Sequence, residues 1–161
     1  MTEASASARG TELCAIIDVA AAPEDVWRFV TDVAALSRRS PQVLRTKVVP
    51  VPVRLGSWMF NVNRSGWRVW PTSARVVRYS PFEEFAFRMN ENFTIWSFRL
   101  EAVEGGTRIT HRRETPQGIS APVRAAIPVV FGGHEAFTAT LLEGMAQTLE
   151  ALKAEIESAA V

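Results

Sequence analysis

The sequence predicts an α+β fold in which a curved antiparallel sheet of about six to seven strands wraps around a long C-terminal helix. Three observations lead to this prediction. Short segments with alternating apolar and polar residues, separated by turn signals, fill the middle of the chain. Two short helical segments follow the first strand, and a long amphipathic segment ends the chain. Hairpin-linked strands form antiparallel sheets, and the apolar stripe of the last helix must then pack against the sheet.

The chain of 161 residues is typical in length of a single domain. Residues 1–10 are small and polar, so we expect a flexible N-terminal tail there and one domain over residues 11–161. The first strand lies in "TELCAIIDVA", where every second residue from Leu13 to Val19 is apolar. This alternation indicates a strand with one buried face.

The first short helix begins near Pro23, because proline favours the first helical turn and Glu24 and Asp25 complement the helix dipole there. Its apolar stripe continues to Val33, and a second short helical piece follows near residues 34–36. Both pieces precede the main run of strands, so we expect them to close one end of the sheet.

The middle of the chain alternates between apolar and polar residues in several separate runs. One strand is expected over residues 40–50, and two more over residues 57–81, joined by a turn at 64–66. Three further strands are expected over residues 83–91, 92–103 and 107–115. "EGG" at 104–106 predicts a tight hairpin turn between the last two. These runs form the antiparallel part of the sheet.

A segment rich in Pro and Gly follows, in which Pro122–Ile127 is a candidate for a short helix. The chain then ends in a long helix whose apolar stripe runs from His134 through Phe137 and Leu141 to Ile156. His134, at the start of this stripe, is expected to face inward.

The formal net charge of +1, from 18 basic and 17 acidic residues, offers no strong overall field for nucleic acid or anionic lipid. We therefore expect no nucleic-acid partner. No stretch is long and apolar enough to span a membrane, and "MTEASASARG" has no apolar core, so we expect neither a membrane span nor a signal peptide. With Cys14 as the one cysteine, a reducing, cytoplasmic location is expected. A homodimer remains open.

The sequence predicts neither a metal nor a cofactor. Two histidines and one cysteine, far apart, lack the spacing of metal ligands. "FGGHE" is the start of a helix and does not match a phosphate-binding loop. The five tryptophans and nine phenylalanines are the more informative residues, because aromatic side chains either fill a core or line a pocket for a flat apolar ligand.

Four stretches carry a family resemblance. "IIDVAAAPEDVWRFVTDVAAL" joins a strand to an Ala-Pro helix start, and "PVRLGSWMFNVNRSGWRVWPTSARVVRYSPFEEFAFRM" forms aromatic hairpins. "WSFRLEAVEGGTRITHRRE" is a further hairpin and "GMAQTLEALKAEIE" a terminal helix. In this order, over residues 11–157, they resemble the polyketide cyclase/dehydrase and lipid-transport group of the START-like superfamily (helix-grip, SRPBCC).

The resemblance implies a helix-grip fold with a cavity between the sheet and the last helix. It implies less about activity, because the group contains aromatase/cyclases, lipid and hormone carriers and quinone-binding proteins, and one fold hosts many functions. The group has no universal catalytic motif to transfer to this chain. Function must therefore be argued from the residues of the site.

Aromatic and apolar side chains are the candidates for the wall of a ligand pocket, with packing in the core as the equally favoured alternative for each. The candidates are Trp58, Phe60, Trp70, Phe85, Phe87, Trp96, Phe98, Phe137 and Leu141. Trp96 and Phe98 are the strongest, because same-face neighbours on a central strand point toward the long helix.

"ITHRRETP" at 109–116 holds candidates for polar groups in the pocket. By alternation His111 and Arg113 face inward, while Arg112 and Glu114 lie on a solvated outer face. A one-residue bulge would reverse this. Buried without a partner, a guanidinium is costly, so Arg113 is expected at a cavity mouth, beside a carboxylate or turned outward. An ordinary strand end with solvated charges is the favoured alternative to a catalytic role.

Three functions remain open. The first is a domain that binds a hydrophobic, polycyclic or aromatic small molecule. The second is a polyketide cyclase/dehydrase in which His111 and His134 move protons and Arg113 stabilises an enolate. The third is an interaction module with a filled core. The few histidines and the lack of paired inward carboxylates favour binding over catalysis.

Overall fold

A computed structural model describes residues 1–6, 12–40, 42–118, 121, 124–125 and 133–159. The helices of this part of the chain are α1 (Pro23–Thr31), α2 (Val33–Arg39) and α4 (His134–Ala159). The strands are β1 (Glu3–Ala6), β2 (Leu13–Val19), β3 (Val43–Val49), β4 (Trp58–Ser65), β5 (Arg68–Ser80), β6 (Glu84–Met89), β7 (Ile95–Val103) and β8 (Gly106–Glu114). The predicted α+β class and the order of elements are confirmed.

All strands belong to one antiparallel sheet of eight strands in the order β1-β2-β8-β7-β6-β5-β4-β3. The strand beyond the predicted six to seven is β1. The sequence predicts a flexible tail over residues 1–10, whereas Glu3–Ala6 pairs with β2, Ala4 lying opposite Ala15. The physical reason is that the backbone of β2 would otherwise form an open sheet edge. Short polar residues are no obstacle to this backbone pairing.

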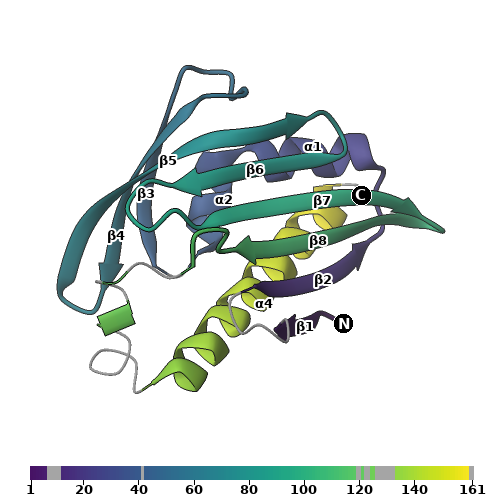
Figure 1. The fold of residues 1–161 in the computed structure, drawn as a ribbon. Coiled ribbons are helices and arrows are strands. Elements are labelled where there is room, and N and C mark those ends of the chain that lie inside the picture. The colour runs from purple at the N-terminus through teal and green to yellow at the C-terminus, as the bar shows by residue number, and fades with distance from the viewer. Residues whose placement is uncertain (7–11, 41, 119–120, 122–123, 126–132, 160–161) are drawn as a thin grey trace.

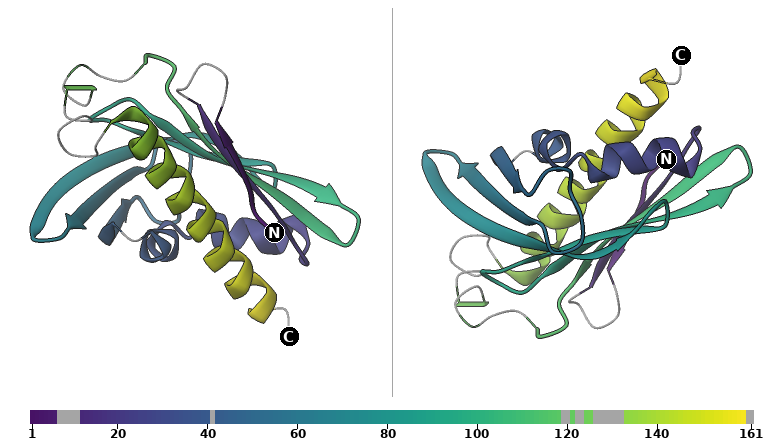
Figure 2. Two further views of the ribbon diagram at one scale, coloured as in Figure 1. Left: turned by 90° about the horizontal axis from the view of Figure 1, so that it is seen from below. Right: turned by 90° about the horizontal axis from the view of Figure 1, so that it is seen from above.

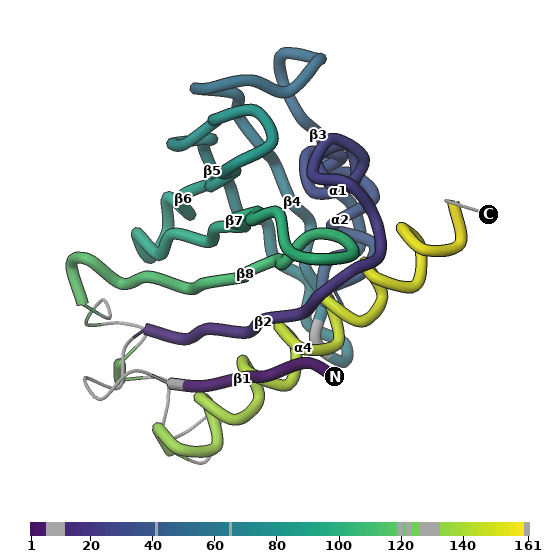
Figure 3. The backbone as a smooth tube through the Cα atoms, turned by 90° about the vertical axis from the view of Figure 1, so that its right-hand side faces the viewer, coloured from purple at the N-terminus to yellow at the C-terminus, as the bar shows by residue number. Residues whose placement is uncertain are grey.

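The helices all lie on one side of the sheet (Figure 1). Seen along the sheet, α4 crosses its concave side obliquely and α1 and α2 lie beside it (Figure 2). The backbone tube shows the strands curving from β1 and β2 around to β3 and β4 (Figure 3). The sheet thus has a concave face toward the helices and a convex face on the opposite side.

The core lies between the concave face and the helices. β2 contributes the alternating residues predicted from its sequence, and Leu13, Ala15, Ile17 and Val19 are all buried. From α4 come Met145, Thr148, Leu149, Leu152 and Ile156, which are spaced at one face of a helix. Removing this apolar surface from water stabilises the fold by roughly 25 cal/mol per Å².

Turns between strands follow the glycine signals in the sequence. Val103 lies opposite Gly106, so Glu104 and Gly105 form a two-residue turn, and Gly105 has φ +81°, which glycine adopts without strain. The β4–β5 hairpin also turns at a glycine with positive φ, since Gly66 has φ +59°. The predicted hairpins at both places are therefore confirmed.

The candidate helix Pro122–Ile127 falls largely outside the described residues. Within the described part of the chain, no helix has the length and apolar character needed to cross a membrane.

Candidate functional site

β7 and β8 form the floor of the candidate site. Trp96 lies directly opposite Arg113 and Phe98 opposite His111, and both pairs point to the concave face. Because the ladder continues without a bulge to Glu114, alternation holds along the whole of β8. His111 and Arg113 are each only 5% exposed. The inward direction expected for both side chains is what the structure shows.

His111 is enclosed by aromatic rings. Its imidazole stacks on Phe98, with ring centroids 4.1 Å apart, and on Trp96 at 5.6 Å. Its Nδ1 lies 3.0 Å from the carbonyl oxygen of Ser97. A carbonyl can only accept, so Nδ1 carries the proton and Nε2 of the neutral ring is left as an acceptor.

Burial lowers the pKa of His111 to about 4, and the Ser97 carbonyl offsets this only in part. Desolvation disfavours the charged imidazolium, and no carboxylate of the described residues pairs with it. At neutral pH the ring is therefore uncharged, and its Nε2 can accept a hydrogen bond.

Arg113 brings a cation into the same apolar region. Its guanidinium carbon lies 5.9 Å from the ring centroid of Trp96 on β7 and 5.9 Å from that of Phe137 on α4. Within the described chain it has neither an ion pair nor a side-chain hydrogen bond. Desolvation lowers its pKa. The two rings offset part of the cost of burial through cation–π attraction.

Glu114 is on the convex face, as expected, but it is not a simple solvated residue. Its two carboxylate oxygens accept hydrogen bonds from Arg78 on β5, both at 2.9 Å. This contact lowers the pKa of Glu114 and raises that of Arg78. Arg112 is exposed and contacts Glu12. These charges hold the outer face together and are kept apart from the concave side by the sheet itself.

The aromatic candidates divide by depth. Phe85 and Phe98 are fully buried in the core. Phe87 and Trp96 are only half-buried and pack at the edge of that core. On α4, Phe137 and Leu141 are half-buried too. Trp96 and Phe98 lie against His111, and Trp96 and Phe137 lie against Arg113.

Two candidates lie on the wrong face. Trp58 is 41% exposed and Phe60 49% exposed, and their rings stack on each other at 6.2 Å on the convex face. The reason is strand alternation: Met59 is buried on the concave face, so its neighbours must point outward. Trp70 is also exposed, near the turn of the β4–β5 hairpin.

His134 is exposed, contrary to the inward direction expected from the apolar stripe of α4. The fully buried residues of this helix begin only at Met145, about three turns after its start. The spacing of the stripe was correct, but a long helix can extend beyond the sheet that covers it. His134 therefore does not join His111.

Polar side chains on the concave face of β4 belong to the inner surface as well. Asn61 and Asn63 are both buried. Asn61 accepts a hydrogen bond from Thr46 at 2.7 Å, and Asn63 donates one to Thr72 at 2.8 Å. From the sequence, a ligand contact and ordinary surface polarity explain these two residues equally well, because polar residues in a strand usually face water. Their alternation with Trp58 and Phe60 was the available signal.

The described residues outline an open hollow of about 430 Å³, but it is not the one predicted. It is bordered by Arg45, Lys47, Phe60, Val62 and Pro71 among others, on the convex side of β3–β5. Among the described residues, no group of three or more His, Cys, Asp or Glu side chains is placed to hold a metal ion.

The family model for "Polyketide cyclase / dehydrase and lipid transport" matches residues 5–157. No curated protein matches the chain with significance.

Solved structures of similar fold have low sequence identity. The di-domain ARO/CYC StfQ from the steffimycin biosynthetic pathway has a TM-score of 0.72 at 16% identity, over 94% of this chain and 53% of that one. This chain thus spans about half of that di-domain protein. A protein from Thermus thermophilus has a TM-score of 0.72 at 15% identity, over 93% and 99% of the two chains. A Chromobacterium violaceum protein reaches 0.65 at 20% identity, over 91% and 98%. These likenesses concern the fold.

Proposed function

Because this chain belongs to the polyketide cyclase/dehydrase and lipid transport family, we propose that it binds a hydrophobic, polycyclic or aromatic small molecule between the sheet and α4. The aromatic side chains of Trp96, Phe98 and Phe137 would provide flat apolar walls. Rings of this kind favour flat ligands through stacking and burial of apolar area.

The observation that carries the proposal is the buried guanidinium of Arg113. A buried charge without an opposite charge costs several kcal/mol and is rarely retained for stability. Within the described chain Arg113 faces aromatic rings and no carboxylate. A ligand that carries a carboxylate, an enolate or a carbonyl oxygen would supply the missing partner. We therefore expect an apolar ligand with one acidic or strongly accepting oxygen.

His111 adds a second polar contact beside Arg113. The two residues are on the same face of β8, two positions apart, so their Cα atoms are separated by roughly 6.6 Å. The neutral imidazole, held by the Ser97 carbonyl, would accept a hydrogen bond from a ligand hydroxyl through Nε2. The pair thus suits a ligand with an acceptor and a donor a few ångströms apart.

Fluorescence titration tests this proposal with two flat probes of similar size, anthracene-2-carboxylate and the neutral 2-methylanthracene. We expect saturable binding of both probes, with the carboxylate bound more tightly. Arg113→Met should weaken carboxylate binding at least tenfold and leave binding of the neutral probe nearly unchanged. Arg112→Met removes the neighbouring outward arginine and serves as the matched control. No saturable binding of either probe would favour an interaction module with a filled core.

A second candidate function, cyclisation or dehydration of a polyketide-like chain, is favoured by the position of the uncharged His111 two residues from Arg113 on the concave face. A neutral imidazole can take a proton from an acidic carbon, and a guanidinium two residues away can stabilise the resulting enolate oxygen. Turnover of a linear poly-β-ketone thioester would test this. His111→Ala should abolish turnover and retain binding, whereas the exposed His134→Ala should affect neither. Equal turnover in wild type and His111→Ala would remove the catalytic role.

A further inference from the structure

Charge is distributed very unevenly along this nearly neutral chain. Between Asp32 and Glu83 lie nine of the 18 Lys and Arg residues and none of the 17 Asp and Glu residues. This stretch includes the whole of α2, β3, β4 and β5. The net charge of +1 predicts no strong overall field, but it averages over a strongly basic segment that can attract anionic partners locally.

The convex side of this segment is also apolar. Trp58, Phe60 and Val62 on β4 and Val69 on β5 point outward from the same side and are exposed. At the turn of the hairpin Trp67 is 85% exposed. Large apolar side chains gathered on one exposed sheet face are unusual in a protein that acts alone in water. They indicate a contact surface.

Basic side chains surround these apolar residues. Arg45 and Lys47 lie outward on β3, Arg64 on β4 and Arg75 on β5, and all four are exposed. Among the described residues none of the four forms an ion pair. Glu91, the acidic residue that borders this surface, has its carboxylate held by the backbone N–H and hydroxyl of Ser73. We call this apolar and basic surface the hairpin face.

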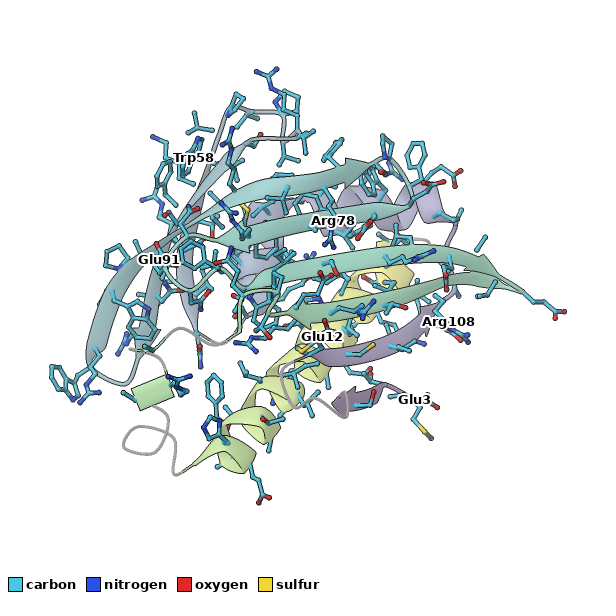
Figure 4. All side chains as sticks on the ribbon, viewed as in Figure 1. Glu3, Glu12, Trp58, Arg78, Glu91 and Arg108 are labelled. Atoms are coloured by element: carbon cyan, nitrogen blue, oxygen red, sulfur yellow. The ribbon has the colours of Figure 1, made fainter. Side chains whose placement is uncertain are left out.

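Over β2, β7 and β8 the convex face is different, because its charges are paired. Arg78 pairs with Glu114, Arg108 with Asp18, and Arg112 with Glu12. Figure 4 shows Arg78 and Arg108 over the middle and the opposite end of the sheet, away from Trp58 on the β4–β5 hairpin. The unpaired cations are therefore concentrated where the apolar side chains are exposed.

We propose that the hairpin face docks on the surface of an anionic lipid bilayer. Tryptophan and phenylalanine beside arginine and lysine match the interface of a membrane, where apolar rings enter the headgroup region and cations meet lipid phosphates. The hollow of about 430 Å³ bordered by Arg45, Lys47 and Phe60 is large enough to receive a headgroup. Exposed Val62 and Val69 fit acyl chains and offer no surface on which nucleic-acid bases would stack. The docking is independent of the ligand site, since it uses the opposite face of the sheet.

Vesicle flotation tests the proposal with the full chain. Wild type should float with vesicles of phosphatidylcholine and phosphatidylglycerol, less so at high salt, and should not float with phosphatidylcholine alone. Arg45→Gln/Lys47→Gln should lower the partition coefficient about 30-fold. Each cation contributes about 1 kcal/mol to binding, and each 1.4 kcal/mol changes the partition coefficient about tenfold. The control variant Arg99→Gln/Arg112→Gln has the same net charge as Arg45→Gln/Lys47→Gln, but its changes lie outside the hairpin face. It should bind like wild type.

A second pair of variants tests the apolar contact. Phe60→Ser on the hairpin face should lower partition about tenfold. Phe82→Ser removes a phenylalanine of similar exposure, 45% against 49%, at the β5–β6 turn and should have little effect. Equal loss in both double-charge variants, or no flotation of wild type, would overturn the proposal. Binding of a single-stranded oligonucleotide without vesicle binding would assign the face to nucleic acid instead.

Discussion

The imidazole of His111 lies flat against the phenyl ring of Phe98, with 4.1 Å between ring centroids and 6° between ring planes. The two residues are directly opposite each other on β8 and β7, on the concave face. Ring stacking excludes water from the imidazole and lowers its pKa. A pair of residues 13 positions apart in sequence thus defines the chemistry of the candidate site.

The pH dependence of stability should report the buried state of His111. The pKa is about 4 in the folded protein, against 6.5 for an exposed histidine. Between these values the unfolded chain binds a proton that the folded chain does not, so stability falls as the pH falls. From about pH 7.5 to about pH 5 we expect a loss of about 2 kcal/mol in the free energy of unfolding. Urea denaturation measures it.

His111→Gln should remove most of this loss, because glutamine has no charge to gain and can still donate to the Ser97 carbonyl. His134→Gln removes the exposed histidine and should keep the wild-type profile. Identical profiles for wild type and His111→Gln would contradict the assignment.

Replacing Arg113 with methionine should stabilise the protein. Methionine fills a similar volume, contacts the rings of Trp96 and Phe137, and carries no charge to desolvate. We expect Arg113→Met to raise the free energy of unfolding by about 1–3 kcal/mol. The exposed Arg112→Met should have a free energy of unfolding within about 0.5 kcal/mol of the wild-type value. Thermal and urea unfolding measure both. A clear loss of stability in Arg113→Met would mean that the guanidinium has a structural partner.

Trp96 and Phe98 should respond differently to truncation, because only Phe98 is fully buried. Phe98→Ala leaves a cavity in the core and should cost about 3–5 kcal/mol. Trp96→Ala should cost about 1–2 kcal/mol and weaken probe binding more than tenfold, if the indole lines the ligand site. Chemical denaturation and fluorescence titration separate the two effects. A large stability loss in Trp96→Ala without a change in binding would place Trp96 in the core.

Replacement of two different glycines by alanine should change the stability of the protein in opposite directions. A Cβ on Gly106 would lie 2.0 Å from the carbonyl oxygen of Val19, so the β2 backbone would have to move. We expect Gly106→Ala to cost about 2–3 kcal/mol. Apart from its own helix backbone, a Cβ on Gly144 in the middle of α4 meets no atom within 4 Å, and Gly144→Ala should gain about 0.5–1 kcal/mol. The two melting temperatures should move in opposite directions, and a shift of the same sign would contradict this account.

Local sequence pattern was sufficient for most of the fold. Alternation predicted the inward residues of β2 and the inward side chains of His111 and Arg113. Glycine and proline signals predicted the turn at Gly105 and the start of α1 at Pro23. These features depend on the backbone geometry of a few neighbouring residues, which is why they can be predicted from one sequence.

Which face of a strand points to the helices, and how far a helix remains covered, depend on the whole sheet. Alternation separated Trp58 and Phe60 from Met59, but only sheet curvature and packing placed Met59 inside and the two aromatic rings outside. Helical spacing gave His134 the same stripe as Leu141, yet the stripe is fully buried only from Met145 onward. The sequence by itself determined periodicity, turns and the order of elements. Tertiary structure decided which periodic face is buried, because burial depends on partners that are distant in the chain.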